Sequence, residues 1–276
     1  MKTLRYKSYD PAVYLLEQIL VKLGFPVVIS NYFGKDTETA VKSFQLKHDL
    51  VIDGIVGVKT WSKLLAIENT LFNNTDKLLS EKDLMDFSKK FNLDLAIVKA
   101  INEVESNGKG FLISGRAKIL FEGHVFWKEL EKRGISPEKY VSAKTRHVLY
   151  PKWTKKYYVG GEGEYLRLET AASIQKSKDF HDAAHASASW GAFQIMGYHY
   201  KDLGYTSVNA FVEAMQIHER EHLHAFGMYL KANKLLPFLR EKDWDAFSRA
   251  YNGPSYKKNQ YDKRLKLLYF KYTAKN

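Results

Sequence analysis

The stretch LAIVKAINEVESNGKGF, residues 95–111, decides how the rest of the chain is organised. Its apolar residues recur at about 100° per residue, which predicts an α-helix with Val98 and Ile101 on the buried side. Glu105 projects on that same side, in the last turn before two glycines end the helix. Burial disfavours a carboxylate anion, and so does the negative end of the helix dipole. We therefore expect Glu105 to be a carboxylic acid that keeps its proton near neutral pH.

Glu103 provides the contrast, because it points almost the opposite way, together with Ala96 and Lys99. We expect it to be exposed and to pair weakly with Lys99 at i,i+4 spacing. A protonated acid such as the one expected at Glu105 is what cleavage of a glycosidic bond needs as its general acid. The structural alternative is a glutamate that only closes an amphipathic helix and reaches solvent.

Four segments carry motifs that follow one another in order along the chain. Glu105, Ser106 and Gly108 form an E-S-x-G turn that resembles the catalytic glutamate segment of goose-type lysozymes and soluble lytic transglycosylases. The segments SASWGAFQIMGYHY (187–200) and RAYNGPSY (249–256) resemble the second and third motifs of that superfamily. Together with ILFEGHVFW (119–127), they resemble the N-acetylmuramidase domain of phage endolysins.

The resemblance implies a mainly α (α+β) chain with a lysozyme-like, mostly helical catalytic domain and a small sheet. It implies hydrolysis of the β-1,4 bond between N-acetylmuramic acid and N-acetylglucosamine in peptidoglycan, leading to lysis of the bacterial host, without a cofactor. Two alternatives stay open. A lytic transglycosylase would cleave the same bond with one glutamate and form an anhydro product, and an inactive lysozyme fold would serve as a binding or structural tail protein.

A smaller unit precedes this domain. The patterns FG-x-x-T-x-x-AV-x-x-FQ (33–45) and DGIVG-x-x-TW (53–61) resemble the three-helix peptidoglycan-binding domain of many wall hydrolases. By that resemblance the ligand groove lies near Asp53 and Gly54. The helices are expected at 11–23, from a cap near Asp36 or Thr37, and at about 60–65.

These features divide the chain into a peptidoglycan-binding domain at 1–66, a linker at 67–79 and a catalytic domain at 80–276. Ser80 and Asp83 are spaced as a capping box at the start of the last part. Further helices are expected at 169–188, 208–232, 244–251 and 259–272. Residues 119–127, as a strand or a short buried helix, and 160–163, as a turn or hairpin, have the composition for the small sheet.

Glu122 is a second candidate catalytic carboxylate, because its apolar neighbours imply burial and a buried glutamate is seldom unpaired. It is either a base or stabiliser across the cleft from Glu105, or a structural partner of His124. Glu162 and Glu164 are rivals for the catalytic role. The distance between two such carboxyl groups decides between retention and inversion.

The resemblance also implies substrate-binding residues. Gln194, Tyr251 and Asn252 are expected to face the sugar cleft, where an amide can bind an N-acetyl group or a hydroxyl. Asn252 precedes a glycine, so it is expected to end its helix as well.

The segment HEREH, residues 218–222, satisfies the H-E-x-x-H signature of zinc peptidases. On a helix His218 and His222 would share a face, and Glu219 could act as a base. The helix is expected to be polar all around the motif, however, and no third ligand follows. A zinc-dependent peptidoglycan peptidase through these three residues is thus a further alternative, while the muramidase interpretation needs no metal.

The 276 residues include 43 Lys and Arg against 31 Asp and Glu, a net charge of +12. This excess favours anionic partners, so we expect binding to peptidoglycan and non-specific attraction to anionic envelope polymers. The basic residues are scattered, and the densest group, KKNQYDKRLK (257–266), is interpreted as a solvated helix face. No motif for nucleic-acid binding is present.

No apolar run is long enough to span a bilayer, and the N-terminus MKTLRYKSYD lacks an apolar signal-peptide core. The absence of cysteine fits synthesis in a reducing compartment. We expect a monomer that is made in the host cytoplasm without a signal peptide and does not insert into membranes. It would act on the cell wall, in the periplasm, after release.

Overall fold

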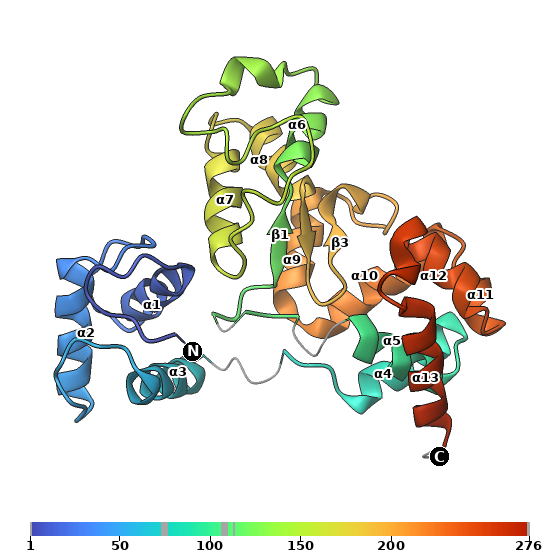
Figure 1. Ribbon diagram of the computed structural model, residues 1–276, viewed down its shortest axis with the longest axis horizontal. Coiled ribbons are helices and arrows are strands. Elements are labelled where there is room, and N and C mark those ends of the chain that lie inside the picture. The colour runs from blue at the N-terminus through green and yellow to red at the C-terminus, as the bar shows by residue number, and fades with distance from the viewer. Residues whose placement is uncertain (1, 73–76, 106–109, 113, 275–276) are drawn as a thin grey trace.

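The computed structural model describes residues 2–72, 77–105, 110–112 and 114–274. Figure 1 shows three N-terminal helices at one end and a larger body that extends to the opposite end, where the C-terminus lies. The architecture confirms the prediction of a mainly α chain with a three-helix unit ahead of a mostly helical domain with a small sheet. Among the described residues, no helix has both the length and the apolar character to cross a membrane.

The N-terminal helices are α1 (Pro11–Lys22), α2 (Lys35–Lys47) and α3 (Val58–Phe72). The side chain of Asp10 caps α1 by accepting a hydrogen bond from the amide of Ala12. Gly34, rather than Asp36 or Thr37, is the N-cap of α2. Helix α3 continues to Phe72, so residues 67–72, predicted as linker, are helical.

The larger body contains α4 (Glu81–Phe91), α5 (Leu95–Glu105), β1 (Ile119–Phe121), α6 (Gly123–Glu131), η2 (Pro137–Tyr140), α7 (Gly163–Ala172), α8 (Lys178–Ala186), β2 (Ala188–Trp190), β3 (Ile195–Met196), η3 (Gly197–His199), α9 (Val208–Ile217), α10 (Glu219–Ala232), α11 (Leu236–Arg240), α12 (Trp244–Asn252), η4 (Pro254–Lys257) and α13 (Tyr261–Thr273). Its strands pair antiparallel in the order β1-β2-β3, with Ile119 opposite Trp190 and Trp190 opposite Ile195.

The sheet comes only partly from the predicted segments. Residues 119–127 form β1 followed directly by α6, so both expected alternatives occur. Strands β2 and β3 arise from the 187–200 motif, whereas residues 160–163 form a turn into α7. The turn between β2 and β3 contains Gly191 at φ 73° and Gln194 at φ 50°. These left-handed conformations reverse the chain within a few residues.

Two long predicted helices are each divided in two. Ser177 caps α8 by accepting a hydrogen bond from the amide of Phe180, which separates α8 from α7. His218 is extended, at φ −162°, and its side chain caps α10 by accepting from the amide of Arg220. Side-chain caps inside an apolar pattern therefore end and restart the helices.

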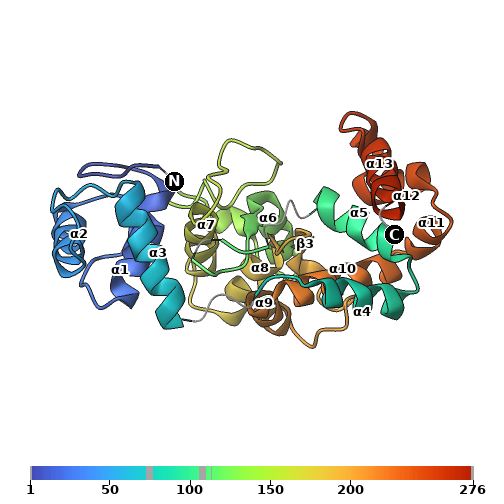
Figure 2. The same cartoon turned by 90° about the horizontal axis from the view of Figure 1, so that it is seen from below.

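Helix α5 is held between α4 and α13, and Figure 2 shows it beside α13 at the end of the molecule distant from α1–α3. The capping box of Ser80 and Asp83 is present at the start of α4, as predicted. Val98 and Ile101 of α5 are each 1% exposed in the core. This packing fixes the end of α5, where Glu105 lies.

Candidate active site

Glu105 is the last residue of α5 and directly follows the buried Val104. Burial raises the pKa of Glu105 to about 7, although the positive charge of Arg264 opposes the shift. The hydroxyl of Tyr261 donates a hydrogen bond to Oε1 of Glu105. The result is a carboxyl group that can hold a proton near neutral pH and release it.

Tyr251 of α12 lies next to this carboxyl group. Burial raises the pKa of Tyr251 well above its ordinary value, and the charge of Glu105 adds to the effect. The Tyr251 ring lies 6.2 Å from that of Tyr261 and stacks on Phe247 at 5.6 Å, measured between centroids. Tyr251 therefore lies near Glu105, and its contact with the sugar stays a prediction.

Sequence reasoning missed Tyr261 and Arg264 because they belong to the basic group 257–266, which it interpreted as a solvated face. Instead, Tyr261 is 7% exposed and Leu265 is fully buried, since this part of α13 packs along α5. The i,i+4 spacing of these two apolar residues was the available signal.

Glu103 lies on another side of α5 and contacts solvent. Its carboxylate pairs with Nζ of Lys271 at 2.8 Å and accepts a hydrogen bond from the hydroxyl of Tyr272. The expected pairing with Lys99 is wrong, because Lys99 pairs instead with Glu81 at 2.6 Å. Helix α13 thus contacts both glutamates of the NEVES segment.

Glu122 occupies the N-cap position of α6, with 14% of its side chain exposed. The hydroxyl of Tyr158 lies 2.7 and 2.8 Å from its two oxygens, and Nδ1 of His124 lies 3.3 Å from Oε2. Glu122 is thus mostly, though not fully, buried, and it contacts His124. A catalytic role for Glu122 stays a prediction.

Glu122 directly follows β1, and this position determines how far its carboxylate lies from the end of α5. The amide of Lys118, at the start of this strand, donates a 2.8 Å hydrogen bond to the carbonyl of Gly110, shortly after α5. Glu122 lies four residues further on, which is about 13 Å along an extended chain. It is therefore at the end of β1 that points away from Gly110.

Glu164 is fully buried and saturated with contacts. It pairs with Arg167 at 2.7 Å and accepts hydrogen bonds from the amides of Phe121, Val159 and Gly160. A buried charge with this many partners serves to hold the chain in place. We infer a structural role for Glu164.

Glu162 is also buried, and burial raises the pKa of its carboxyl group. Its Oε1 accepts a hydrogen bond from Ser114, and Oε2 lies 3.9 Å from the guanidinium of Arg116. These contacts likewise tie α7 to the segment before β1.

Gln194 uses its side-chain amide inside the β2–β3 turn. Its Oε1 accepts a 2.9 Å hydrogen bond from Ser189, and its Nε2 donates to the carbonyls of Gly191 at 2.8 Å and Lys118 at 3.2 Å. Asn252 is the last residue of α12 and is exposed, followed by Gly253 at φ 70°, which confirms the predicted helix end. Sugar contacts by Gln194 and Asn252 stay predictions.

The turn at Asp53 and Gly54 is held by Gln45 of α2. Its Oε1 accepts a hydrogen bond from the amide of Gly54, and its Nε2 donates to Oδ1 of Asp53, both at 2.9 Å. A pocket of ≈ 280 Å³ lies beside this turn, with Val51 and Val58 in its lining. Ligand binding there stays a prediction.

The H-E-x-x-H residues are not on a polar helix surface as expected. Glu219 is 5% exposed, and its carboxylate accepts hydrogen bonds from the amides of Gly110 at 2.8 Å and Leu79 at 3.0 Å. His218 lies outside the helix, as its N-cap. The two histidines therefore do not share a helix face.

His222 is 1% exposed, and burial lowers the pKa of its imidazole. Its Nδ1 accepts a 3.2 Å hydrogen bond from the amide of Ala192, and its Nε2 lies 2.7 Å from the carbonyl of Met215. Both ring nitrogens thus have protein partners and do not fit a metal ligand. Among the described residues, no group of three or more His, Asp and Glu could hold a metal ion.

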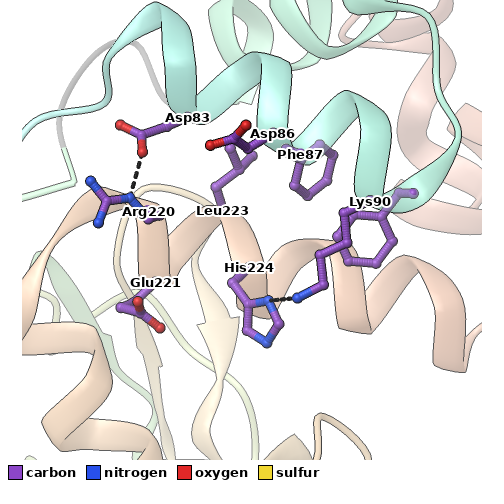
Figure 3. A pocket seen from close by; sticks show the side chains of 9 residues that line it. Asp83, Asp86, Phe87, Lys90, Arg220, Glu221, Leu223 and His224 are labelled. Carbon is purple, nitrogen blue, oxygen red and sulfur yellow. Dashed lines mark hydrogen bonds and ion pairs between the residues drawn. The ribbon is translucent and has the colours of Figure 1, made fainter.

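A pocket of ≈ 350 Å³ opens elsewhere, between α4 and α10 (Figure 3). Figure 3 shows Arg220 paired with Asp83, and Lys90 directed at His224, with 3.0 Å between their nitrogens. These interactions connect the two helices across the pocket. None of the residues that surround Glu105 lines it.

The N-acetylmuramidase family model matches residues 94–273. The chain belongs to the N-acetylmuramidase family. A model of a peptidoglycan binding domain matches residues 9–64, ahead of the muramidase domain. A search of curated proteins gives no match.

Among solved structures, the muramidase is similar to the Burkholderia AP3 phage endolysin, with 39% sequence identity and a TM-score of 0.66. The similarity covers 99% of this chain and 100% of that one. The muramidase is thus a peptidoglycan glycosidase with an N-terminal domain for binding peptidoglycan. The predicted family, partner and substrate class are confirmed.

Proposed function

We propose that the enzyme hydrolyses the β-1,4 bond between N-acetylmuramic acid and N-acetylglucosamine, as a lysozyme, with Glu105 as the general acid. The observation that carries this proposal is the pKa of about 7 that burial gives Glu105 at the end of α5. A carboxylic acid in that state can protonate the oxygen of the leaving sugar. The similarity to a phage endolysin supports a role in host lysis.

The contacts of Glu105 suggest how the proton is handled. Tyr261 donates its hydrogen bond to Oε1, so the proton that is transferred sits on Oε2. The glycosidic oxygen takes this proton as the bond breaks. The carboxylic acid of Glu105 then becomes a charged carboxylate. The hydroxyl of Tyr261 and the positive charge of Arg264 then stabilise it.

Glu122 is the proposed second carboxylate, acting through a water molecule or as an electrostatic stabiliser. Glu122→Gln and Tyr158→Phe separate this role from a structural one. In the catalytic case Glu122→Gln lowers kcat far more than Tyr158→Phe does. If both variants lose stability alike and keep kcat, Glu122 serves only to hold the 139–161 connection.

The remaining site assignments are proposals of the same kind. Tyr251, Gln194 and Asn252 would contact the glycan near Glu105, and Asp53 and Gly54 would bind it in the N-terminal domain. Residues 1–66 would bind the wall and residues 80–276 would cleave it. Hydrogen bonds from Nζ of Lys77 to the carbonyls of Gly115 and Gln216, and from the Leu79 amide to Glu219, support a catalytic unit that begins at Lys77.

Mass spectrometry of digested peptidoglycan tests the proposal. Hydrolysis at this bond leaves muramic acid at the reducing ends of the products. Anhydromuramic acid would identify a lytic transglycosylase, and cut peptides with intact glycan would identify a peptidase. Either of the last two results would refute the proposed reaction.

A further inference from the structure

The connection between α6 and α7 carries a concentration of positive charge that the catalytic account does not use. Its 23 residues from Lys139 to Gly161 include five lysines and one arginine, and no aspartate or glutamate. This segment therefore contributes half of the net charge of +12. Figure 1 shows it, in green to yellow-green, in the lobe formed by α6, α7 and α8.

All six cations are available to an external partner. They are exposed: Lys139, Lys144, Arg146, Lys152, Lys155 and Lys156. Within the described part of the chain none of them forms an ion pair, whereas the nearby Arg133 and Arg167 are paired with Glu129 and Glu164. Like charges gathered without counter-charges repel one another, and a surface with many negative charges would relieve that repulsion.

Apolar side chains are exposed among these charges. Trp153 is 59% exposed, Val159 52% and Val141 46%. Nζ of Lys155 lies 5.8 Å from the centre of the Trp153 ring, so cation and indole are presented side by side. An exposed tryptophan beside lysines is the combination found at the interface between a membrane and water.

The base of the connection is anchored in the domain. Tyr150 is 8% exposed, and its hydroxyl contacts the amide of Gly123 and the guanidinium of Arg167, both at 3.3 Å. Tyr158 is bound to Glu122. The anchored tyrosines therefore hold Trp153 and its lysines outward as a fixed surface.

The composition separates two classes of partner. Side-chain amides and carboxylates can bind sugar hydroxyls and N-acetyl groups through two atoms at once, and residues 139–161 contain no Asn, Gln, Asp or Glu. Lysines attract an anionic leaflet without fixed geometry, and an indole ring is favoured at headgroup level. We propose that residues 139–161 dock the catalytic domain on the surface of an anionic phospholipid bilayer, without spanning it.

Sedimentation of the full-length protein with vesicles tests this proposal. We expect binding to phosphatidylcholine vesicles that contain phosphatidylglycerol, and little binding to pure phosphatidylcholine. Because each cation near such a surface contributes roughly five-fold to partitioning, K152Q/K155Q/K156Q should weaken binding about 100-fold. The matched control K258Q/K263Q/K266Q removes the same charge from the 257–266 group and should weaken binding far less.

Tryptophan fluorescence gives an independent result. Three of the five tryptophans, Trp61, Trp190 and Trp244, are at most 8% exposed, so a blue shift on vesicle binding should come largely from Trp153. Trp153→Phe should remove most of that shift. Cleavage of soluble glycan by each variant shows that the domain is folded.

Three outcomes would overturn the proposal. Equal losses in the two triple variants would mean that net charge alone drives vesicle binding. A blue shift that survives Trp153→Phe would place the contact elsewhere. Loss of binding to purified sacculi in K152Q/K155Q/K156Q, with vesicle binding intact, would assign the segment to peptidoglycan.

Discussion

The carboxylate of Glu219 accepts a 2.8 Å hydrogen bond from the amide of Gly110, five residues beyond Glu105. A β-carbon at Gly110 would come within 2.6 Å of Nδ1 of His222 and 2.7 Å of Oε1 of Glu219. The Glu219 and His222 side chains therefore hold the chain that follows the catalytic helix. Glu219 and His222 of the H-E-x-x-H match therefore pack around Gly110, where no larger residue fits, and this packing explains the match.

This arrangement predicts that activity does not depend on zinc. EDTA should leave the rate of glycan cleavage unchanged, and His218→Ala should lose little, because His218 only caps α10. The measurement is turbidity clearance of bacterial walls with and without the chelator. Activity lost in EDTA and restored by zinc would support the peptidase alternative instead.

Glu219→Gln should instead affect stability. The substitution keeps the shape of the side chain but weakens two hydrogen bonds to a buried charge, at a cost of about 1–3 kcal/mol. Chemical denaturation of Glu219→Gln and His218→Ala, as the matched pair, measures the difference. Equal stability of the two variants would contradict the holding role of Glu219.

The two domains should be separable at a defined residue. Nζ of Lys77 donates hydrogen bonds to the carbonyls of Gly115 at 3.0 Å and Gln216 at 2.9 Å. A fragment from Lys77 to Asn276 should cleave soluble glycan, and one from Leu78 should be less stable by about 1–3 kcal/mol. Both should lose affinity for sacculi. Wall binding equal to that of the full chain would refute the role given to the N-terminal domain.

The shifted pKa of Glu105 predicts two pH dependences. Activity should fall as pH rises through about 7, because the general acid loses its proton. A raised pKa also means that the folded state favours the protonated form. Glu105 therefore contributes its full stabilisation of the folded state below pH 4.5, the ordinary pKa of a glutamate. This stabilisation is lost as the pH rises through about 7.

Glu105→Gln abolishes this titration, so its stability relative to the native protein should increase with pH, by up to about 3 kcal/mol. Urea denaturation of both proteins at several pH values measures it. A stability difference that is constant with pH would contradict the burial of Glu105.

The local sequence was sufficient to predict a helix or strand where apolar residues repeat regularly within that one element. Helix α5 was predicted with Glu105 in its last turn, because its apolar positions recur regularly and glycines follow Glu105. Strands β2 and β3 are three and two residues long, too short for any periodicity to show. The break at His218 was missed because histidine is not among the usual N-cap residues.

The contacts of the site depend on pairs that are distant in the sequence. Tyr261 meets Glu105 across 156 residues, and Lys271 meets Glu103 across 168. Sequence reasoning assigned Lys99 to Glu103, since it considered only neighbours on the same helix. The packing of α13 on α5 decides both contacts.

The central claim is that Glu105, and not Glu103, donates the proton. Glu105→Gln keeps the shape of the side chain and removes that proton, so turnover should fall by about 10²–10⁴. Glu103→Gln weakens an exposed ion pair with Lys271 and a hydrogen bond from Tyr272, so turnover should stay nearly unchanged and stability should fall slightly.

Turnover of these two variants on purified peptidoglycan is the most direct measurement, with thermal unfolding as the check on folding. We predict a large loss of turnover for Glu105→Gln, with a melting temperature that is unchanged or higher, and near-native turnover for Glu103→Gln. Losses in the reverse order would contradict the assignment, and the site would then have to be built around Glu103.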